Sequence, residues 1–214
     1  MPDSWGELTG TGPATASASV LLVLAAGAST RHGGRPKALL EIDSVPAVVR
    51  IIRAAREAGV HEAVVVVGAH EEPITAALAG ERATVVVNET WELGRTGSVL
   101  RGLSAIPAEA NVLLWPVDHP FAESNIVRRI ETAAMRDTVA AWIVPTFEGH
   151  GGHPVWMAPP ARRMVQSLAP DTPLRSVLPR LGVQVLRLPV DDASVLASTD
   201  TPEEYRAALD ARRR

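Results

Sequence analysis

The 214-residue sequence contains no cysteine, and its longest apolar run is far too short to cross a membrane. The first absence excludes disulfides, thiolate catalysis and zinc or iron–sulfur sites built on cysteine. The second excludes a membrane-spanning helix, which needs about 20 apolar residues. Residues 1–19 have neither the basic start nor the apolar stretch of a secretory signal. We therefore expect a cytoplasmic protein with a flexible N-terminal tail at 1–19.

The chain also lacks a strong charge of either sign, because its formal net charge is only −3. This balance argues against nonspecific binding to nucleic acid or to a membrane surface. Apolar residues make up 46% of the chain, an ordinary fraction for a globular protein with a buried core. The length predicts one large domain, which we place at 20–214.

Short apolar runs alternate with helical patterns along the chain. The expected strands lie at 20–26, 63–68, 83–87, 112–117, 139–144 and 183–188, with short extended pieces at 38–42 and 154–157. Pro116 is awkward inside a central strand, so we expect the fourth strand to end near Trp115. The expected helices run from 46 to 59, from 71 to 80, from about 96 to 103, from 124 onward, and over 160–168, 173–181 and 202–212. This alternation predicts an α/β fold with a mainly parallel sheet and helices on both faces.

The stretch 20–40, VLLVLAAGASTRHGGRPKALL, has the strongest functional signal. It begins as a buried strand and leaves the sheet through small residues at 26–29, which let a ligand approach the backbone. Successive backbone N–H groups in such a turn bind anions, and Arg31 and Lys37 add positive charge. The spacing fits neither a Walker A loop nor a G-x-G-x-x-G dinucleotide loop. The stretch predicts a polyphosphate site; a tight turn with incidental surface cations is the alternative.

The string L-A-A-G-x-S-x-R, followed by G-G-x-P-K, resembles the signature of the nucleotidyltransferase superfamily with the GT-A-like, Rossmann-like fold. That superfamily includes the molybdenum-cofactor cytidylyl- and guanylyltransferases, and the resemblance extends from Val20 to about Tyr205. It implies a single-domain enzyme in which Lys37 and Arg31 are catalytic. It also implies nucleotide binding by the loop residues Leu24, Ala25, Ala26, Gly27 and Ser29.

Asp118 and Asp200 are the candidate metal ligands, and Asp118 is also a candidate catalytic residue. Asp118 follows the fourth strand, and ligands bind outside the carboxyl ends of strands in open α/β sheets. Carboxylates there can hold Mg²⁺ against nucleotide phosphates. The resemblance implies the same roles, because the family places an Asp close before Pro and an Asp or Asn before a Thr-Pro helix start. The alternatives are a local turn for Asp118 and a helix-dipole contact for Asp200.

The segment 88–98, NETWELGRTGS, resembles the N-x-x-W-x-x-G-x-x-x-S-L segment of the molybdenum-cofactor transferases. The resemblance implies that Asn88, Gly94 and Ser98 help to hold the base and ribose. Gly68 ends the second strand at the same edge, where it can also face the nucleotide. We interpret Trp91 as a packing residue rather than a base-stacking one.

The segment 149–154, GHGGHP, resembles the G-x-x-G-H-P segment of the cytidylyltransferases in the molybdenum-cofactor branch. There it lies toward the acceptor, which implies acceptor contacts for Gly152 and His153. His119, where many relatives carry Gln, joins them as a candidate. The alternative for His153 is a histidine that orders a glycine loop. A zinc site from His150 and His153 is disfavoured, because no third ligand is spaced nearby.

The leading hypothesis is transfer of CMP from CTP to the molybdopterin cofactor, by direct Mg²⁺-assisted in-line attack that releases pyrophosphate. The expected partners are the nucleotide, the phosphorylated acceptor and a molybdoenzyme or cofactor-insertion protein, with no nucleic acid and no membrane. A guanylyltransferase, or a transferase acting on a sugar or other phosphate, is the first alternative. A non-catalytic nucleotide- or cofactor-binding chaperone is an alternative of another class. A glycosyltransferase is disfavoured, because the sequence after Asp118 lacks the second Asp of D-x-D.

Overall fold

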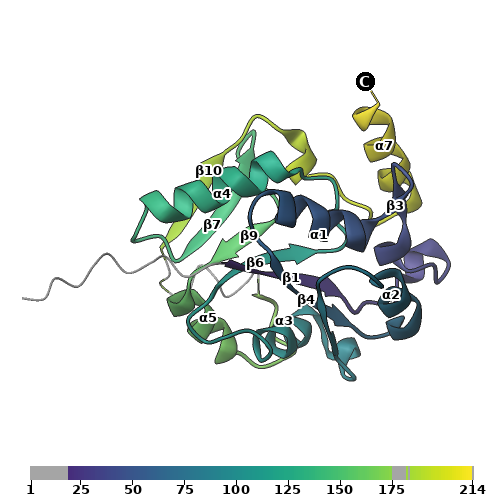
Figure 1. Ribbon diagram of the computed structural model, residues 1–214, viewed down its shortest axis with the longest axis horizontal. Helices are drawn as coiled ribbons and strands as arrows, with labels where there is room; N and C mark the ends of the chain where they lie inside the picture. The colour runs from purple at the N-terminus through teal and green to yellow at the C-terminus, as the bar shows by residue number, and fades with distance from the viewer. Residues whose placement is uncertain (1–18, 175–181, 183, 214) are drawn as a thin grey trace, which may run out of the picture.

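The computed structural model describes residues 19–174, 182 and 184–213, and it has an α/β fold with a mainly parallel central sheet (Figure 1). The sheet order is β10-β7-β9-β6-β1-β4-β5. The strands are β1 (Ser19–Ala25), β4 (Glu62–Val67), β5 (Thr84–Val87), β6 (Asn111–Pro116), β7 (Trp142–Phe147), β9 (Val155–Met157) and β10 (Val185–Pro189), with β8 (His150–Gly151) paired to β7. Only β8 and β9 run antiparallel to their neighbours in this sheet. The predicted fold class is confirmed.

Helices cover both faces of the sheet (Figure 1). They are α1 (Ala47–Glu57), α2 (Glu71–Ala77), α3 (Arg95–Leu103), α4 (Ser124–Arg136), α5 (Pro159–Gln166) and α7 (Pro202–Arg212). Side chains of β1 alternate between the two cores. Leu21 and Val23 pack with residues of α1 and α4, whereas Leu22 and Leu24 pack with residues of α3 and α5. Because both faces of β1 are buried, this strand has no polar alternation.

Two predicted strand boundaries are wrong. Strand β6 continues through Pro116, because the neighbouring strand β9 reaches only Leu114 and the proline nitrogen therefore interrupts no ladder. Strand β7 begins at Trp142 rather than at Val139. The carboxylate of Asp137 accepts hydrogen bonds from the backbone of Val139 and Ala140, which holds that segment in a turn.

Other elements differ from the predicted ranges by a few residues at their ends, such as α2, which ends at Ala77 rather than at 80. Strand β1 begins at Ser19, and residues 1–18 of the expected tail lie outside the described residues. Most of the helix expected at 173–181 also lies outside them. Helix α7 begins at Pro202 as predicted, and the Thr201 hydroxyl caps it by accepting from the Glu204 backbone N–H. No helix in the described ranges is long and apolar enough to span a membrane.

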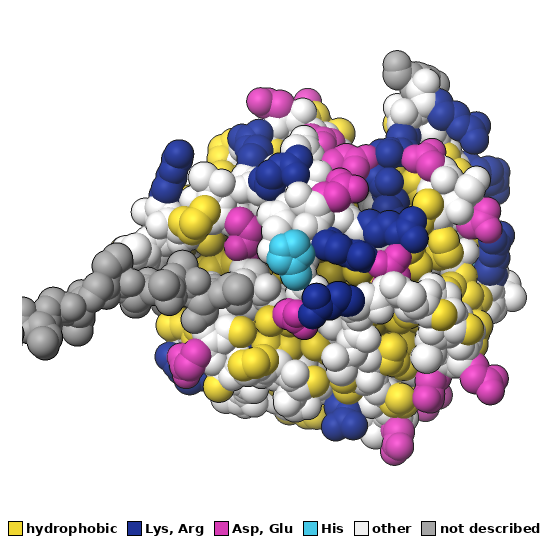
Figure 2. Space-filling view, viewed as in Figure 1, with side chains coloured by type: hydrophobic (Ala, Val, Ile, Leu, Met, Phe, Trp, Pro, Cys, Tyr) yellow, Lys and Arg dark blue, Asp and Glu magenta, His cyan; other side chains and the backbone are white. Residues whose placement is uncertain are grey.

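Basic side chains gather over α1 and α4 on the face shown in Figure 2. Those of α1 have acidic partners. Arg50 pairs with Glu123, and Arg53 and Arg56 both pair with Glu81. These pairs tie α1 to the segments around it and neutralise much of its charge.

Candidate active site

A cavity of about 310 Å³ lies at the carboxyl ends of β1 and β6. Many of the predicted nucleotide-binding and catalytic residues line it: Leu24, Ala25, Ala26, Gly27, Ser29, Lys37, Gly94, Ser98 and Asp118. The cavity forms there because parallel strands direct their following loops to one edge of the sheet. Arg95 and Glu92 also line it, and the sequence analysis missed both.

The loop after β1 closes on itself through Ser29. This residue has a left-handed backbone (φ 54°), and its hydroxyl accepts a hydrogen bond from the Lys37 backbone N–H at 3.0 Å. The backbone carbonyl of Ser29 accepts from His32 N–H at 2.9 Å. The loop thereby holds Lys37 at the wall of the cavity and leaves open space around Gly27.

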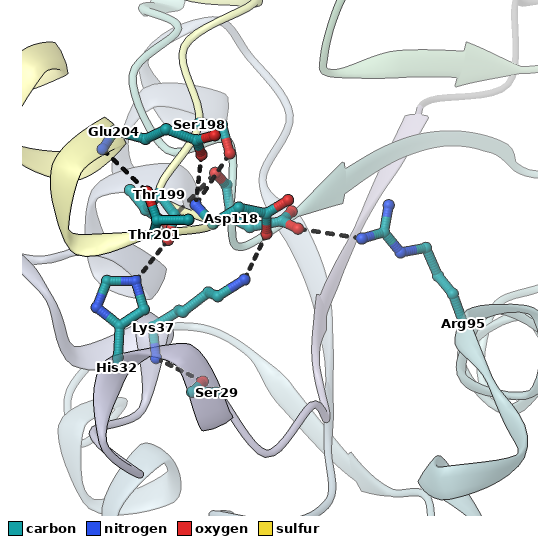
Figure 3. A network of polar contacts seen from close by, with 10 residues as sticks. Ser29, His32, Lys37, Arg95, Asp118, Ser198, Thr199, Thr201 and Glu204 are labelled. Carbon is teal, nitrogen blue, oxygen red and sulfur yellow. Dashed lines mark hydrogen bonds and ion pairs between the residues drawn. The ribbon is translucent and has the colours of Figure 1, made fainter.

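The first ion pair of the site joins the loop to the far end of the chain. Lys37 Nζ lies 2.5 Å from Asp200 Oδ1. In Figure 3 the contact is the dashed line that starts at the labelled Lys37 side chain; Asp200 is drawn without a label. Burial raises the pKa of Asp200, but the hydrogen bond and charge of Lys37 outweigh it and hold that pKa below the usual range. Asp200 is therefore an anion held beside the phosphate loop.

The second ion pair joins Asp118 to Arg95, in the first turn of α3. Asp118 is only 7% exposed, and its Oδ2 accepts from Arg95 Nη2 at 3.0 Å (Figure 3). Its other oxygen, Oδ1, is buried and has no hydrogen-bond partner among the described residues. A buried carboxylate oxygen without a partner is costly, so it is ready to accept a ligand.

The segment 198–200 holds the two carboxylates in one site. Thr199 is fully buried, and its backbone N–H donates to the Asp118 carbonyl at 2.8 Å. The Thr199 carbonyl accepts from His32 Nε2 at 2.7 Å, from the phosphate loop (Figure 3). His32 thus joins the loop after β1 to the segment that carries Asp200. No local pattern predicts this contact, because the two residues lie 167 positions apart.

Three of the predicted catalytic and nucleotide-binding residues do not line the cavity, and neither does the predicted metal ligand Asp200. Arg31 is exposed in the short helix at Thr30–His32. Asn88 is buried behind the cavity wall, where its Nδ2 donates to the Ser98 hydroxyl at 3.0 Å. Gly68 packs under the Trp91 ring, so closely that a Cβ there would lie 2.8 Å from it. In this arrangement Asn88 orients Ser98, and Gly68 lets Trp91 approach the cavity.

The predicted acceptor residues meet beside Asp118. The rings of His119 and His153 lie 4.6 Å apart, tilted by 44°. Burial lowers the pKa of both imidazoles, that of His153 to about 3, so both rings are neutral near pH 7. Each Nδ1 is buried without a partner among the described residues. Gly152, which precedes His153, donates its N–H to the Pro145 carbonyl and lies outside the cavity lining.

The carboxylates fit a divalent cation that keeps much of its hydration. No cluster of three His, Asp or Glu side chains suited to a metal occurs within the ranges that the structure covers. A cation such as Mg²⁺ needs no such cluster, since it takes one or two carboxylates together with substrate phosphates. The buried Asp118 Oδ1, which has no partner in the part of the chain that the structure describes, is the observation that fits this kind of site.

Comparison with known proteins gives a consistent family. Residues 21–185 match the family described as the MobA-like NTP transferase domain. Nicotine blue oxidoreductase of Paenarthrobacter nicotinovorans is 28% identical over 191 residues, which cover 86% of this chain and 94% of that protein. The crystal structure of Rv0371c from Mycobacterium tuberculosis aligns at a TM-score of 0.80 and 27% identity, over 92% of this chain and 100% of that one.

Two further structures align well. A manganese complex of the same mycobacterial protein has a TM-score of 0.76 and 25% identity, over 91% of this chain and 100% of that one. The molybdopterin-guanine dinucleotide biosynthesis protein A of Archaeoglobus fulgidus has a TM-score of 0.67 over 91% of this chain and 98% of its own. At 13% identity, the latter shows a shared fold alone.

Proposed function

Because this chain belongs to the MobA-like NTP transferase family, we propose that it transfers CMP from CTP to the phosphate of molybdopterin, releasing pyrophosphate. The observation that carries the proposal is the cavity beside the loop after β1, which Lys37, Arg95 and Asp118 line, with Asp200 paired to Lys37. Lys37 and Arg95 are suited to a triphosphate, and Asp118 and Asp200 to a divalent cation. A site of this composition supports nucleotidyl transfer.

In the proposed reaction, an oxygen of the acceptor phosphate attacks the α-phosphorus of CTP. The bond between the α-phosphorus and its bridging oxygen breaks, and pyrophosphate leaves with that oxygen. Such a transfer depends on positioning and charge neutralisation more than on covalent help. Backbone N–H groups at 24–29 would hold the triphosphate, while Lys37 and Arg95, which line the cavity, would neutralise the leaving group. No covalent enzyme intermediate is needed.

Asp118 and Asp200 would hold the divalent cation, for which we propose Mg²⁺. When bound, such a cation supplies positive charge that polarises the phosphates. The manganese complex of the mycobacterial relative supports a divalent cation in this fold. In the structure, Lys37 and Arg95 form ion pairs with these carboxylates. When the divalent cation and the triphosphate bind, both basic side chains would therefore move from the carboxylates to the phosphates.

The choice of CTP and of molybdopterin rests on the segment that contains Gly152 and His153. Its G-x-x-G-H-P pattern resembles the cytidylyl branch. The neutral rings of His119 and His153 have unused hydrogen-bonding atoms beside Asp118, which suits a pterin or phosphate group. A guanylyltransferase would share the two histidine rings beside Asp118 and would differ in its contacts to the base.

A second candidate function is suggested by the curated relative named as a nicotine blue oxidoreductase, which matches over most of its length. By that analogy the chain would oxidise or reduce an aromatic small molecule at the same site. The sequence lacks the G-x-G-x-x-G loop of dinucleotide-binding enzymes, which disfavours this candidate. A non-catalytic chaperone would bind the nucleotide or cofactor and release no pyrophosphate.

One assay separates these candidates: pyrophosphate release with each nucleoside triphosphate, Mg²⁺ and molybdopterin, in the wild type and in Asp118→Asn. The proposal is supported if CTP is the one nucleotide that gives pyrophosphate release and if the Asp118→Asn variant loses that release. If GTP is the one nucleotide that gives it, the chain belongs to the guanylyl branch. Tight nucleotide binding without release supports the chaperone. Consumption of a nicotinamide dinucleotide without pyrophosphate release supports the oxidoreductase.

A further inference from the structure

A second concave surface lies between helix α4 and strand β10, and no candidate site residue lines it. This groove has a volume of about 750 Å³ and an apolar floor that includes Val139, Leu186 and Leu188. One of its apolar lining residues, Val139, is 69% exposed. Exposed apolar groups that gather at one place mark an interaction surface.

One side of the groove is the open edge of the sheet. Strand β10 is the last in the sheet order, and among the described residues it pairs only with β7. The Gln184 carbonyl accepts from Trp142 N–H, and Val190 N–H donates to the Thr146 carbonyl, so alternate residues of β10 face β7. The residues between them, Val185 and Arg187, therefore direct their backbone N–H and C=O groups away from the sheet. Such an edge is a template for another strand.

The rim of the groove is basic. Arg128, Arg129 and Arg136 line it, and none of them forms an ion pair with a carboxylate in the part of the chain that the structure describes. Arg128 and Arg129 donate only to neutral oxygens, the latter to the Pro189 carbonyl at 2.7 Å. Asp137 is the one acidic lining residue, and its Oδ1 is used by the turn that precedes β7. In a chain of net charge −3, this is a local excess of positive charge, over α4 in Figure 2.

We propose that the groove docks an extended acidic segment of a partner protein, which adds to β10 as a further strand. Backbone groups of Val185 and Arg187 would pair with the segment, and its apolar side chains would cover Leu186 and Leu188. Its carboxylates would pair with the arginines of the rim. In this mode of recognition, main-chain hydrogen bonds supply affinity and alternate side chains supply specificity.

The charges argue against two other occupants. A second copy of this chain, paired edge to edge through β10, would bring the arginines of both copies together, and like charges at close range are unfavourable. A nucleic acid would pair with the arginines but would leave the strand edge unpaired and the apolar floor uncovered. An acidic peptide satisfies the backbone, the floor and the rim together.

The test uses a fluorescent peptide of about eight residues in which the alternate positions that face α4 carry both Val and Glu, with binding measured by fluorescence anisotropy. We expect binding that weakens as salt is added, because the ion pairs are exposed. Replacing every Glu of the peptide by Lys, or methylating alternate backbone nitrogens, should abolish binding. Arg136→Glu should weaken binding about fivefold, since it turns one attraction into a repulsion. Arg136 is exposed and makes no contact within the described residues, so the variant should fold normally.

Arg163→Glu is the matched control, because Arg163 lies on α5, which packs on the opposite face of the sheet. It should leave peptide binding unchanged, and both variants should keep wild-type nucleotide binding, which separates this proposal from the proposed function. The proposal is overturned if the acidic peptide does not bind at about millimolar concentration. Equal binding of the Lys or methylated peptide, wild-type binding by Arg136→Glu, or tighter binding of a single-stranded oligonucleotide would also overturn it. The proposal would also be overturned if the protein formed a dimer in solution and Arg136→Glu changed that dimer.

Discussion

Lys37 and Arg95 each pair with a carboxylate that a divalent cation would also need. These contacts make metal and triphosphate binding interdependent. A cation that binds alone is repelled by the two basic side chains that pair with these carboxylates, and a triphosphate that binds alone is repelled by the carboxylates. Binding the two together exchanges partners without leaving a charge unpaired, so each should raise the affinity for the other.

Arg95 gives the first test at the scale of single residues. In Arg95→Gln, the competing cation is gone from Asp118, so Mn²⁺ should bind the nucleotide-free protein more tightly. Because the Arg95 side chain is 58% exposed, the gain should be only about two- to fivefold. Triphosphate affinity should fall in the same variant. Electron paramagnetic resonance titration with Mn²⁺ measures the first effect, and Arg101→Gln, on the same helix but outside the cavity, is the control. Unchanged or weaker Mn²⁺ binding would contradict this role.

Lys37 should matter for the chemical step. Lys37→Ala removes a positive charge placed for the leaving pyrophosphate, and loss of one such stabilising group costs about 3–4 kcal/mol in other enzymes. The kcat for pyrophosphate release should therefore fall about 10²- to 10³-fold. Lys37→Arg, which keeps the charge but changes its geometry, should lose less. Near-normal turnover in Lys37→Ala would show that the phosphate-loop assignment is wrong.

His153 should make stability depend on pH. Its pKa in the folded protein, about 3, lies below the ordinary value of 6.5 because the ring is buried. Between these values the unfolded chain binds a proton that the folded chain does not, so stability falls as the pH is lowered below about 6.5.

The metal-free protein should lose about 1–2 kcal/mol of stability to this residue between pH 7.5 and pH 5, allowing for partial exposure of the ring. His153→Gln should remove that part of the loss and leave the smaller contribution of His119. Urea denaturation at the two pH values measures the difference. The same pH dependence in wild type and variant would contradict the neutral, buried ring.

At the scale of elements, α3 sits so close to the sheet that its position depends on Gly102. A Cβ at Gly102 would lie 2.3 Å from Leu22 and 2.8 Å from Val66. Gly102→Ala should therefore destabilise the protein by about 1–3 kcal/mol through overpacking. Gly97→Ala, on the same helix with no contact closer than 3.5 Å, is the matched control and should be neutral or stabilising by up to about 1 kcal/mol. Thermal unfolding of both variants measures the contrast, and equal effects would contradict the close packing of α3.

Most elements could be predicted from the sequence because their signals are local. The valine run of β4 and the capped start of α7 each lie within a few residues, and the structure has both elements. The misplaced boundaries depended on partners instead. Pro116 is tolerated because β9 is short, and β7 starts late because Asp137 bonds to the chain after it. Neither fact can be read from the segment concerned.

The site, like the fold, has parts with a local sequence signal and parts that depend on distant residues. The loop at 20–40 is one continuous motif, and both carboxylates adjoin recognisable strand or helix ends. The pairing of Arg95 with Asp118, and of His32 with Thr199, joins residues that lie 23 and 167 positions apart. These contacts follow from the packing of the whole molecule, so the sequence offered no signal for them.

At the scale of the whole molecule, the parallel strands bring the first and last parts of the chain to one edge. The loop after β1 and the segment before α7 meet there through Lys37 and Asp200. The groove beside β10 lies on a different element pair and shares no lining residue with that cavity. The molecule thus has room for a nucleotide at one place and a partner segment at another.

The most direct test of nucleotidyl transfer follows the phosphorus atoms of the nucleotide. CTP labelled with ³²P at the α position or at the γ position is incubated with the protein, Mg²⁺ and molybdopterin, and the products are separated. We predict that the α label moves to the acceptor while the γ label leaves in pyrophosphate, and that Asp118→Asn stops both. Transfer of the γ label to the acceptor, or equal transfer by the Asp118 variant, would contradict the assignment of this site.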